Sequence, residues 1–536
     1  MKADVVIVGS GIAAVAVARR ILGRRPATSI VVLEAGRQVK MRDFAVYQDY
    51  LVSGNLPYTG YYDLPAPSGG QPGENQLTGS PQMTLAGTRL MMFGGTTVHW
   101  DGYSFRLKPE DFRLHSNTGH GIDWPITYDD LEPYYGQAER FIGVSGDSAD
   151  TSVPRSTGFP FQAFPYTLED TFAIQAFNQL GLSFSHLPIA RNGLPNGESN
   201  KPPCQTTGSC LYCPFGARYN AANDMADLLE TSTLTLRTDA VVERVLVDGR
   251  RRARGVEYLD RVSGKRTVVE ADTVVIAGGT IESPKLLQRS TSEFWKNGIG
   301  NDLGLVGRNI VTHPWINYQA AVPANRLRLQ PEMAFPTLVS RHYDSVAEQP
   351  CGKFVMINPN TSPNNINLAK AMQEGRSRRE IDAMVDGPMV VEMNTLFEIF
   401  SRPEYRVSNL NGTNRIGLPQ TLVNFGQTPL VAQRVSEVLA KVTEVMRAMG
   451  AVGEVTLEDG CPDFGAHHAC CTTRMSDSPE LGVVDANLRV HETDNLYVCS
   501  NASFSTLSSV NPTLTLAALS LRLGDRLLAQ FAGTRS

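Results

Sequence analysis

The sequence predicts an α/β protein organised around a parallel β-sheet, with a second domain of α+β type. Three observations predict this fold class. An apolar strand, a glycine turn and a helix fill residues 4–21, and the same order returns at residues 272–290, beginning with DTVVIAGG. Between residues 316 and 460, short alternating strands mix with helical patterns such as residues 369–385 and 431–449. The two early units are typical of a Rossmann-type domain, and the later segment predicts a discontinuous α+β domain.

The opening strand and turn have the pattern of a phosphate-binding unit. Residues 4–8 form a continuous apolar run, which is typical of a buried parallel strand. Gly9 and Gly11 allow a sharp turn and a close approach of the backbone to a ligand. The helix that begins at Ile12 and Ala13 directs its N-terminal amides toward a pyrophosphate.

The fingerprint continues with an alanine and an acid. Ala14 occupies its third position, where a methyl group still permits close contact between helix and strand. A second strand over residues 29–33 ends at Glu34, twenty residues after Ala14, where a carboxylate can accept hydrogen bonds from ribose hydroxyls. Together these features predict dinucleotide binding, although the fingerprint alone does not separate FAD from NAD.

Length and composition limit the class of protein. The chain has 536 residues, of which 42% are hydrophobic and 19% charged, and its net charge is −5. This length predicts about two to four domains. The negative charge argues against a nucleic-acid partner. No apolar stretch predicts a transmembrane helix, and a strand beginning at residue 4 leaves no room for a signal peptide. We therefore expect a cytoplasmic protein, exported only with a partner subunit.

Three segments follow the opening unit. Residues 65–82 are rich in Pro and Gly and predict a long loop, either a surface excursion or an active-site lid. Residues 94–97 (GGTT) can press backbone and hydroxyl groups against a planar ligand. Residues 123–135 predict a turn that enters a short helix, with Asp129 or Asp130 near its cap.

The middle and the end of the chain add further elements. Residues 241–247 and 254–258 read as strands that precede the second glycine unit. Asn511 lies directly before Pro512, and this pair marks a helix start because Asn is a favoured N-cap and Pro is preferred at the first helical position. We expect Asn511 at the positive end of a long terminal helix.

Four motif groups occur in order along the chain: GSGIAA with Glu34, GGTT at residues 94–97, GGTIESPKLL at residues 278–287, and HACCTTRM followed by VNPTLT. Together they resemble the glucose–methanol–choline (GMC) family of flavin oxidoreductases. GGTTVHW, DWPITYDDLEPYY, LVGRNIVTHP and CPFGARYN look like segments of the bacterial FAD-dependent sugar dehydrogenases and pyranose or glycoside oxidases within that family.

The resemblance implies a Rossmann-type FAD-binding domain with a discontinuous α+β substrate-binding domain. We expect the FAD-binding domain in three parts, at residues 1–110, 226–315 and 461–536, a cap and cysteine-cluster region at 111–225, and the substrate-binding domain at 316–460. The resemblance also implies these cofactor-binding residues: Gly9, Gly11, Ile12, Ala13, Glu34, Gly94, Gly95, Thr96, His99, Val242, Ala277, Asn501, Ala502, Pro512 and Thr513.

Oxidising an alcohol removes a hydroxyl proton and a carbon-bound hydride, so the reaction needs a base and a hydride acceptor. Histidine, with an ordinary pKa of about 6.5, suits the base, and flavin N5 is the acceptor that the resemblance implies. The family's spacing to Met475 favours His468 over His467, which we expect to line the substrate pocket. Asn511 takes the place of the second residue of the family's catalytic pair, a role compatible with helix capping. Glu398 is a further candidate for the substrate pocket.

Two more groups bear on the cofactors. In some pyranose oxidases the histidine of a segment like TVHW carries covalent flavin, so the resemblance leaves open whether FAD is linked to His99 or bound without a bond. Cys204, Cys210 and Cys213 have C-x5-C-x2-CP spacing, which favours metal ligation over disulfides. Related dehydrogenases hold a 3Fe-4S cluster in this region, although the second spacing is one residue shorter here. Zinc and free thiols are the alternatives.

The sequence therefore predicts an FAD-dependent oxidoreductase that oxidises a hydroxyl of a sugar or glycoside and passes the electrons to an external acceptor. A close alternative is an oxygen-reducing pyranose or glycoside oxidase acting at C2 or C3. A nicotinamide dehydrogenase and a non-enzymatic flavin carrier are the other hypotheses. The GGTT segment favours FAD over NAD, and the pair His468 and Asn511 counts against a carrier. Besides the substrate, the expected partner is an electron acceptor or a small export subunit.

Overall fold

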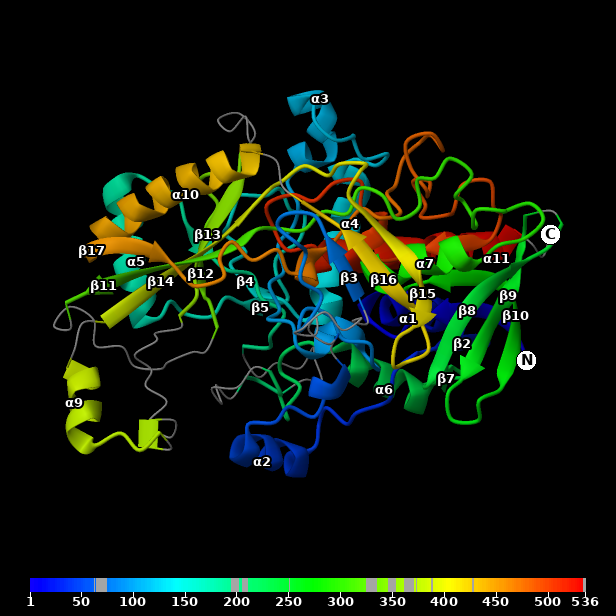
Figure 1. Cartoon of the computed structure of the whole chain (residues 1–536), viewed down its shortest axis with the longest axis horizontal. Helices are drawn as coiled ribbons and strands as arrows, with labels where there is room; N and C mark the ends of the chain where they lie inside the picture. Colours follow the sequence, from blue (N-terminus) through cyan, green and yellow to red (C-terminus); the bar gives the residue numbers. More distant parts are fainter. Residues whose placement is uncertain are drawn as a thin grey trace.

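The structure is a computed structural model. It describes residues 1–61, 63, 75–193, 202–204, 211–249, 251–323, 335–345, 353–360, 371–372, 374–386, 389–426 and 429–533. Figure 1 shows an elongated molecule with both chain termini at one end and the strands β11 (Trp315–Val322) and β17 (Val452–Leu457) at the other. Among the described residues, every helix is too short or too polar to span a bilayer.

A seven-stranded sheet forms the end that carries the termini. Its order is β7-β2-β1-β10-β9-β8, and β18 also pairs with β10. The pairs among β7, β2, β1, β10 and β18 are parallel, whereas β8 and β9 join in antiparallel fashion. The strand bounds are β1 (Lys2–Val8), β2 (Ile30–Leu33), β7 (Thr235–Arg237), β8 (Ala240–Val247), β9 (Ala253–Asp260), β10 (Arg266–Ile276) and β18 (Leu496–Val498).

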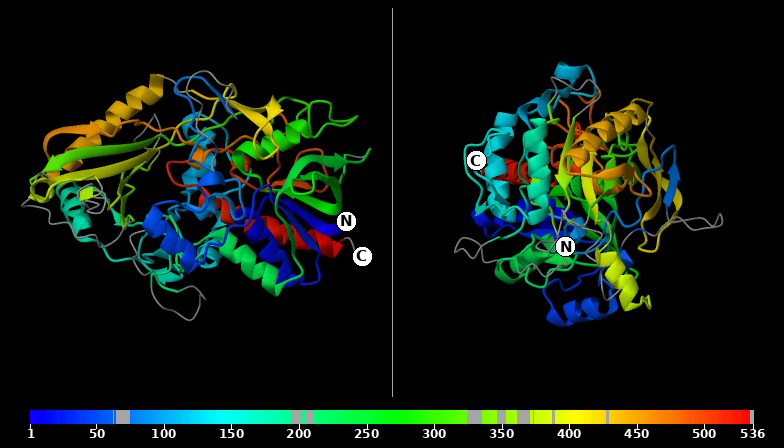
Figure 2. Two further views of the ribbon diagram at one scale, coloured as in Figure 1. Left: turned by 60° about the horizontal axis from the view of Figure 1, so that its bottom comes forward. Right: turned by 90° about the vertical axis from the view of Figure 1, so that its left-hand side faces the viewer.

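The first and the last helix of the chain pack side by side against this sheet. Figure 2 shows α1 (Ile12–Arg24, blue) alongside α11 (Thr513–Gly533, red). The two backbones approach closely because Gly524 has no side chain: a Cβ there would lie 2.7 Å from the Arg20 side chain. Arg20 in turn donates to Asp525 at 2.6 Å. α4 (Tyr128–Ile142) packs on the same terminal helix.

A second, antiparallel sheet forms the other end of the molecule. Its order is β17-β11-β14-β13-β12-β6, and buried and half-buried residues alternate along β11. Helices α5 and α10 pack against each other over this part of the chain, and α10 contacts β11 and β17. The predicted fold class, a Rossmann-type domain with a discontinuous α+β domain, is confirmed. Further bounds are β6 (Ser185–His186), β12 (Leu338–Ser340), β13 (Phe354–Asn358), β14 (Met389–Phe397), α5 (Leu168–Leu180) and α10 (Pro429–Ala448).

The remaining elements connect the two ends. They are β3 (Asn75–Thr78), β4 (Ser145–Gly146), β5 (Phe161–Gln162), β15 (Arg406–Thr413), β16 (Pro419–Asn424), α2 (Phe44–Ser53), α3 (Leu114–Thr118), α6 (Ala221–Thr231), α7 (Gly279–Arg289) and α9 (Arg378–Asp386), with short 3-10 turns including η2 (Gly95–Val98) and η5 (Ala466–His468).

One sequence expectation differs from the structure. Part of the predicted loop at residues 65–82 is the strand β3, which pairs in parallel with β16; residues 65–74 lie outside the described residues. Pairing to a distant strand supplies the hydrogen bonds that local sequence did not predict. The turn expected to enter a helix within residues 123–135 is confirmed, because α4 begins at Tyr128 after the N-cap Thr127 and Asp130 completes the capping box. The predicted domain boundaries stay a prediction.

Candidate active site

The carboxyl ends of β1, β2, β10 and β18 meet at one edge of the large sheet, where an open α/β sheet binds its ligand. Gly9 follows β1 with φ of 100°, and a Cβ there would lie 2.6 Å from the carbonyl oxygen of Ala277. Gly11 has φ of −71°, and the nearest atom to an added Cβ is the Gly94 oxygen at 4.0 Å. The backbone at Gly11 therefore borders open space at the N terminus of α1, as a phosphate requires.

Glu34 lies buried at the end of β2 and organises the turn. Its carboxylate accepts hydrogen bonds from the Ser10 amide at 3.1 Å, the Ser10 hydroxyl at 2.6 Å and the Gly36 amide at 2.9 Å. Burial raises the pKa of Glu34, and these three bonds oppose that rise. Sequence reasoning missed Ser10, although it occupies the variable position between the two glycines of the fingerprint.

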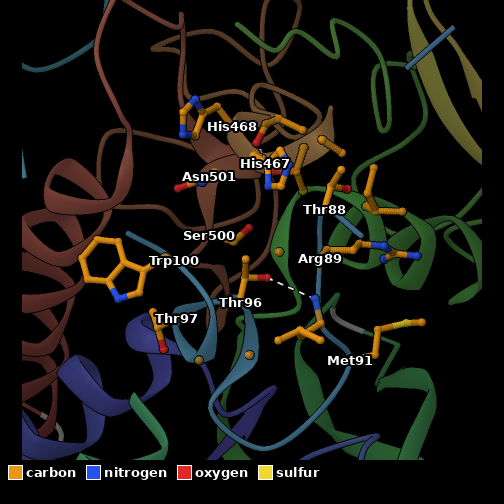
Figure 3. Close-up of a pocket in the computed structure, with 18 of the residues that line it drawn as sticks. Thr88, Arg89, Met91, Thr96, Thr97, Trp100, His467, His468, Ser500 and Asn501 are labelled. Carbon is orange, nitrogen blue, oxygen red and sulfur yellow. Dashed lines mark hydrogen bonds between the residues drawn. The ribbon is translucent and has the colours of Figure 1, made fainter. Parts of the chain in front are cut away.

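The GGTT segment is attached to this turn. The Gly94 amide donates to the Ser10 hydroxyl at 3.0 Å, and the Thr97 hydroxyl donates to the Gly94 oxygen at 2.8 Å. A Cβ on Gly94 would lie 2.6 Å from the Cβ of Ala222. The segment therefore lies tightly between the turn and α6, and Thr96 faces the space in front of the sheet (Figure 3).

A histidine pair and an amide stand opposite the glycine turn. His468 Nε2 lies 2.9 Å from Asn511 Nδ2, and His468 Nδ1 lies 3.0 Å from His313 Nδ1. Burial holds the pKa of His468 well below its ordinary value, and His313 and His467 lower it further, so the imidazole is neutral. Within the described part of the chain, Asn511 Oδ1 accepts no hydrogen bond, so the side chain does not cap the terminal helix.

Two further histidines share the same space. The rings of His99 and His467 lie with centroids 6.0 Å apart. Burial, with smaller contributions from His467 and Arg218, lowers the pKa of His99 to about 3. Asp101 lines the same wall, and its pKa is raised by burial against the opposing effect of Arg218 and Arg191. Figure 3 shows His467 and His468 on one side of the pocket and Thr96, Thr97 and Trp100 on the other.

The glycine turn, Glu34, the GGTT segment, the four histidines and Asn511 line one cavity of about 900 Å³, within the range of ligand sites in proteins. Three of the predicted catalytic, cofactor-binding and substrate residues do not line it. Ala502 is fully buried, Pro512 is buried directly before α11, and Glu398 is buried beside Lys353. The predicted residues that line the cavity are Gly9, Gly11, Ile12, Ala13, Glu34, Gly94, Gly95, Thr96, His99, Val242, Ala277, His467, His468, Asn501, Asn511 and Thr513.

Glu398 does not line the cavity, so the expectation that it contacts the substrate is wrong. Its backbone amide donates to the Lys353 oxygen at 2.7 Å, and burial, with Asp111 and Asp344 adding to it, raises its pKa to about 8 against the effect of Lys353. The end of β14 directs this side chain into a buried cluster of charges. The sequence around β14 does not show whether the Glu398 side chain lies in the cavity or among the buried charged residues.

Two family models match the chain. One GMC oxidoreductase model matches residues 4–315 and another matches residues 406–520. The chain belongs to the GMC oxidoreductase family. It is therefore an FAD-dependent enzyme that acts on CH–OH groups.

Curated GMC relatives span the chain. The fructose dehydrogenase large subunit of Gluconobacter japonicus is 30% identical and covers 98% of both chains. The C-glycoside 3-oxidase of Arthrobacter globiformis is 27% identical, over 98% of this chain and 95% of the relative. The 6'''-hydroxyparomomycin C oxidase of Streptomyces lividus is 26% identical, over 83% of this chain and 80% of the relative.

Solved structures share the GMC fold. Pyridoxine 4-oxidase from Mesorbium loti aligns with a TM-score of 0.64 at 21% identity, covering 98% of this chain and 99% of that one. A formate oxidase aligns with a TM-score of 0.65 at 15% identity, covering 99% and 98%.

The residues of the cavity fit the FAD of a GMC enzyme. The open face of Gly11 leaves room for a pyrophosphate at the start of α1, and the Glu34 carboxylate borders the same cavity, where a ribose would meet it. Asn501 and Asn511 each have a buried side-chain oxygen without a hydrogen-bond partner in the described structure. A bound ligand could supply the missing donors. When bound, FAD supplies the acceptor for a hydride.

The predicted cysteine cluster is only partly visible. Cys204 and Cys213 are half-buried, whereas Cys210 lies outside the described residues. Arg191 Nη1 donates to the Cys204 sulfur at 3.6 Å. Leu211, two residues before Cys213, lines the same cavity.

Proposed function

We propose that the enzyme oxidises a secondary or anomeric hydroxyl of a sugar or glycoside, with His468 as the base, and passes the electrons to an external acceptor. The observation that carries this proposal is the neutral His468 imidazole, 2.9 Å from the Asn511 amide, on the wall of the cavity that the glycine turn borders.

The side chains suit alcohol oxidation. His468 Nε2 takes the hydroxyl proton, because the lowered pKa of His468 keeps this nitrogen unprotonated at neutral pH. Asn511 Nδ2 donates to the same oxygen and holds the hydroxyl toward the base.

Polar and aromatic groups on the same wall support a polyhydroxylated substrate. Asp463 and Asn317 line the cavity beside Trp315, whose indole donates to Asn317 Oδ1 at 2.6 Å. Carboxylates and amides can bind several hydroxyls, and an indole covers an apolar face of a ring. The relatives named fructose dehydrogenase and C-glycoside 3-oxidase fit this substrate class.

Two arrangements of electron transfer are consistent with the relatives. A 3Fe-4S cluster on Cys204, Cys210 and Cys213 would carry electrons outward to an acceptor or small subunit, and the name "large subunit" of the Gluconobacter relative supports this version. The second candidate is an oxygen-reducing oxidase, favoured by the oxidases among the full-length relatives. In that version His99, a neutral imidazole on the cavity wall, is the candidate for covalent flavin attachment.

The test is an anaerobic titration of the holoenzyme with a panel of aldoses, ketoses and glycosides while flavin absorbance is followed. We expect at least one sugar to reduce the flavin, and His468→Ala to retain flavin but to react about 10²- to 10⁴-fold more slowly. The exposed His115→Ala is the control. Unimpaired reduction in His468→Ala would eliminate His468 as the base, and no reduction by any sugar would favour a flavin carrier.

Readmitting air after reduction separates the two acceptors. Slow reoxidation, together with iron and acid-labile sulfide in the protein, supports the external acceptor. Fast reoxidation in a protein without iron supports the oxidase, and flavin that stays with acid-precipitated protein supports the link to His99.

A further inference from the structure

We propose that His313 fixes the tautomer of His468, so that His468 Nδ1 carries the hydrogen and Nε2 is the unprotonated nitrogen that can take the substrate proton. This inference rests on the proposed role of His468 as the base. His313 is thus a positioning residue. It lies in the segment LVGRNIVTHP, and the sequence alone did not identify it as part of the site.

A backbone carbonyl determines the tautomer of His313. His313 Nε2 contacts the carbonyl oxygen of Ser508, and a carbonyl only accepts, so His313 Nε2 carries a hydrogen. His313 is 2% exposed, and burial lowers its pKa to about 4. A neutral imidazole has one N–H, and therefore His313 Nδ1 is a lone pair.

The His313 ring in turn determines which nitrogen of His468 carries the hydrogen. His313 Nδ1 lies 3.0 Å from His468 Nδ1, and only a hydrogen on the His468 nitrogen makes this contact a hydrogen bond. Because His468 is also neutral, its Nε2 is then the unprotonated nitrogen. This is the nitrogen that faces Asn511.

An independent contact agrees with this assignment. The Asn511 amide presents Nδ2, a donor, to His468 Nε2 at 2.9 Å, which requires an acceptor on the ring. The opposite tautomer would set two lone pairs against each other at the Nδ1 contact and two N–H groups against each other at Asn511. Both neighbours therefore select the same tautomer.

The Ser508 carbonyl, which accepts from His313, is itself held in place. The Ser508 hydroxyl donates to Asp111 at 2.8 Å, and the neighbouring Ser509 hydroxyl donates to Asp344. Lys353 pairs with both carboxylates, and all three charged side chains are 3% exposed or less. This buried cluster fixes residues 508–511, which supply both the Ser508 carbonyl and the Asn511 amide.

A matched pair of variants tests the proposal in the holoenzyme. His313→Asn places Oδ1 where the acceptor Nδ1 was, whereas His313→Leu has nearly the same shape and no acceptor. Both lose the contact to Ser508, so their difference reports the hydrogen bond to His468. We expect His313→Leu to lower kcat about 10²-fold with little change in KM, and His313→Asn to recover most of kcat.

The tautomer itself is read from nitrogen NMR of protein labelled with ¹⁵N-histidine, with His468→Gln used for assignment. We expect a protonated Nδ1 and a bare Nε2 for His468 in the unmodified holoenzyme, and a mixture of both tautomers in His313→Leu, where only Asn511 still favours this one. A protonated Nε2 in the unmodified enzyme would overturn the proposal even if His313→Leu failed to fold.

The two proposals fail in different ways. Normal turnover of His313→Leu, with His468→Ala inactive, would refute the tautomer assignment and leave the base in place. An active His468→Ala would instead remove the base, whatever the His313 variants do.

Discussion

Glu34 shows at the scale of one residue how the oxygens of a buried carboxyl group find hydrogen-bond donors. Its carboxylate accepts from three donors on Ser10 and Gly36, which lie at the carboxyl ends of two neighbouring strands. The Ser10 hydroxyl accepts from Gly94 in turn. One carboxylate thus fixes the phosphate turn and the GGTT segment together.

We predict that Glu34→Ala weakens FAD binding by about 10- to 100-fold. The substitution leaves three buried donors without an acceptor, and such groups cost about 1–3 kcal/mol each, part of which appears as lost affinity. The measurement is the FAD dissociation constant from flavin fluorescence. Glu270→Ala, which removes an exposed carboxylate from the same sheet, is the control. Equal affinity in both variants would contradict the prediction.

Sequence predicts those residues of the candidate site that belong to a motif with short, fixed spacing. Gly9, Gly11 and Glu34 follow from spacing within one strand–helix–strand unit, and His468 from its spacing to Met475. His313 has no local signal, because its partner lies 155 residues away. An antiparallel bridge between Val311 and Cys470 aligns the two segments and brings the rings together.

At the scale of elements, the turn between β1 and α1 separates two uses of glycine. Gly9 needs its positive φ and faces protein, since an added Cβ would meet Ala277. Gly11 has an ordinary φ and faces the cavity. The first glycine serves the fold, and the second leaves room for the ligand.

We predict opposite outcomes for alanine at these two positions. Gly9→Ala lowers stability, because a left-handed φ costs roughly 1–2 kcal/mol and the Cβ collides with backbone. Gly11→Ala keeps the fold, with stability unchanged or raised by up to about 1 kcal/mol. Its FAD affinity falls because the methyl group occupies the space of the phosphate. Thermal unfolding and FAD binding together check this, and full FAD affinity in Gly11→Ala would place the pyrophosphate elsewhere.

At the scale of the whole molecule, buried titratable groups tie stability to pH. Burial lowers the pKa of His313 to about 4 and raises the pKa of Glu169 and Glu398 to about 8. The lowered histidine adds stability as pH rises from about 4 to 6.5. The raised carboxyls lose stability as pH rises from 4.5 through 8. Between pH 6.5 and 8, only the loss from these carboxyls operates among the three groups.

We predict that Glu398→Gln flattens this decline. An amide keeps the shape of the protonated acid and cannot ionise, so the slope of unfolding free energy should fall by about 1.4 kcal/mol per pH unit between pH 6.5 and 8. Denaturant unfolding across that range is the measurement. The exposed Glu293→Gln should leave the slope unchanged. An unaltered slope in Glu398→Gln would show that Glu398 is ionised in the folded protein.

The sequence by itself determined the parallel sheet, the glycine turn, the acid at the end of β2 and the histidine near the C terminus, because each depends on neighbouring residues with a fixed period or spacing. Only the tertiary structure decided that His313 stands behind His468 and that Glu398 turns into a buried ion cluster. The same holds for β3, which pairs with a strand more than 300 residues away. These features depend on contacts between segments that are far apart in the sequence, and a local sequence pattern does not predict such contacts.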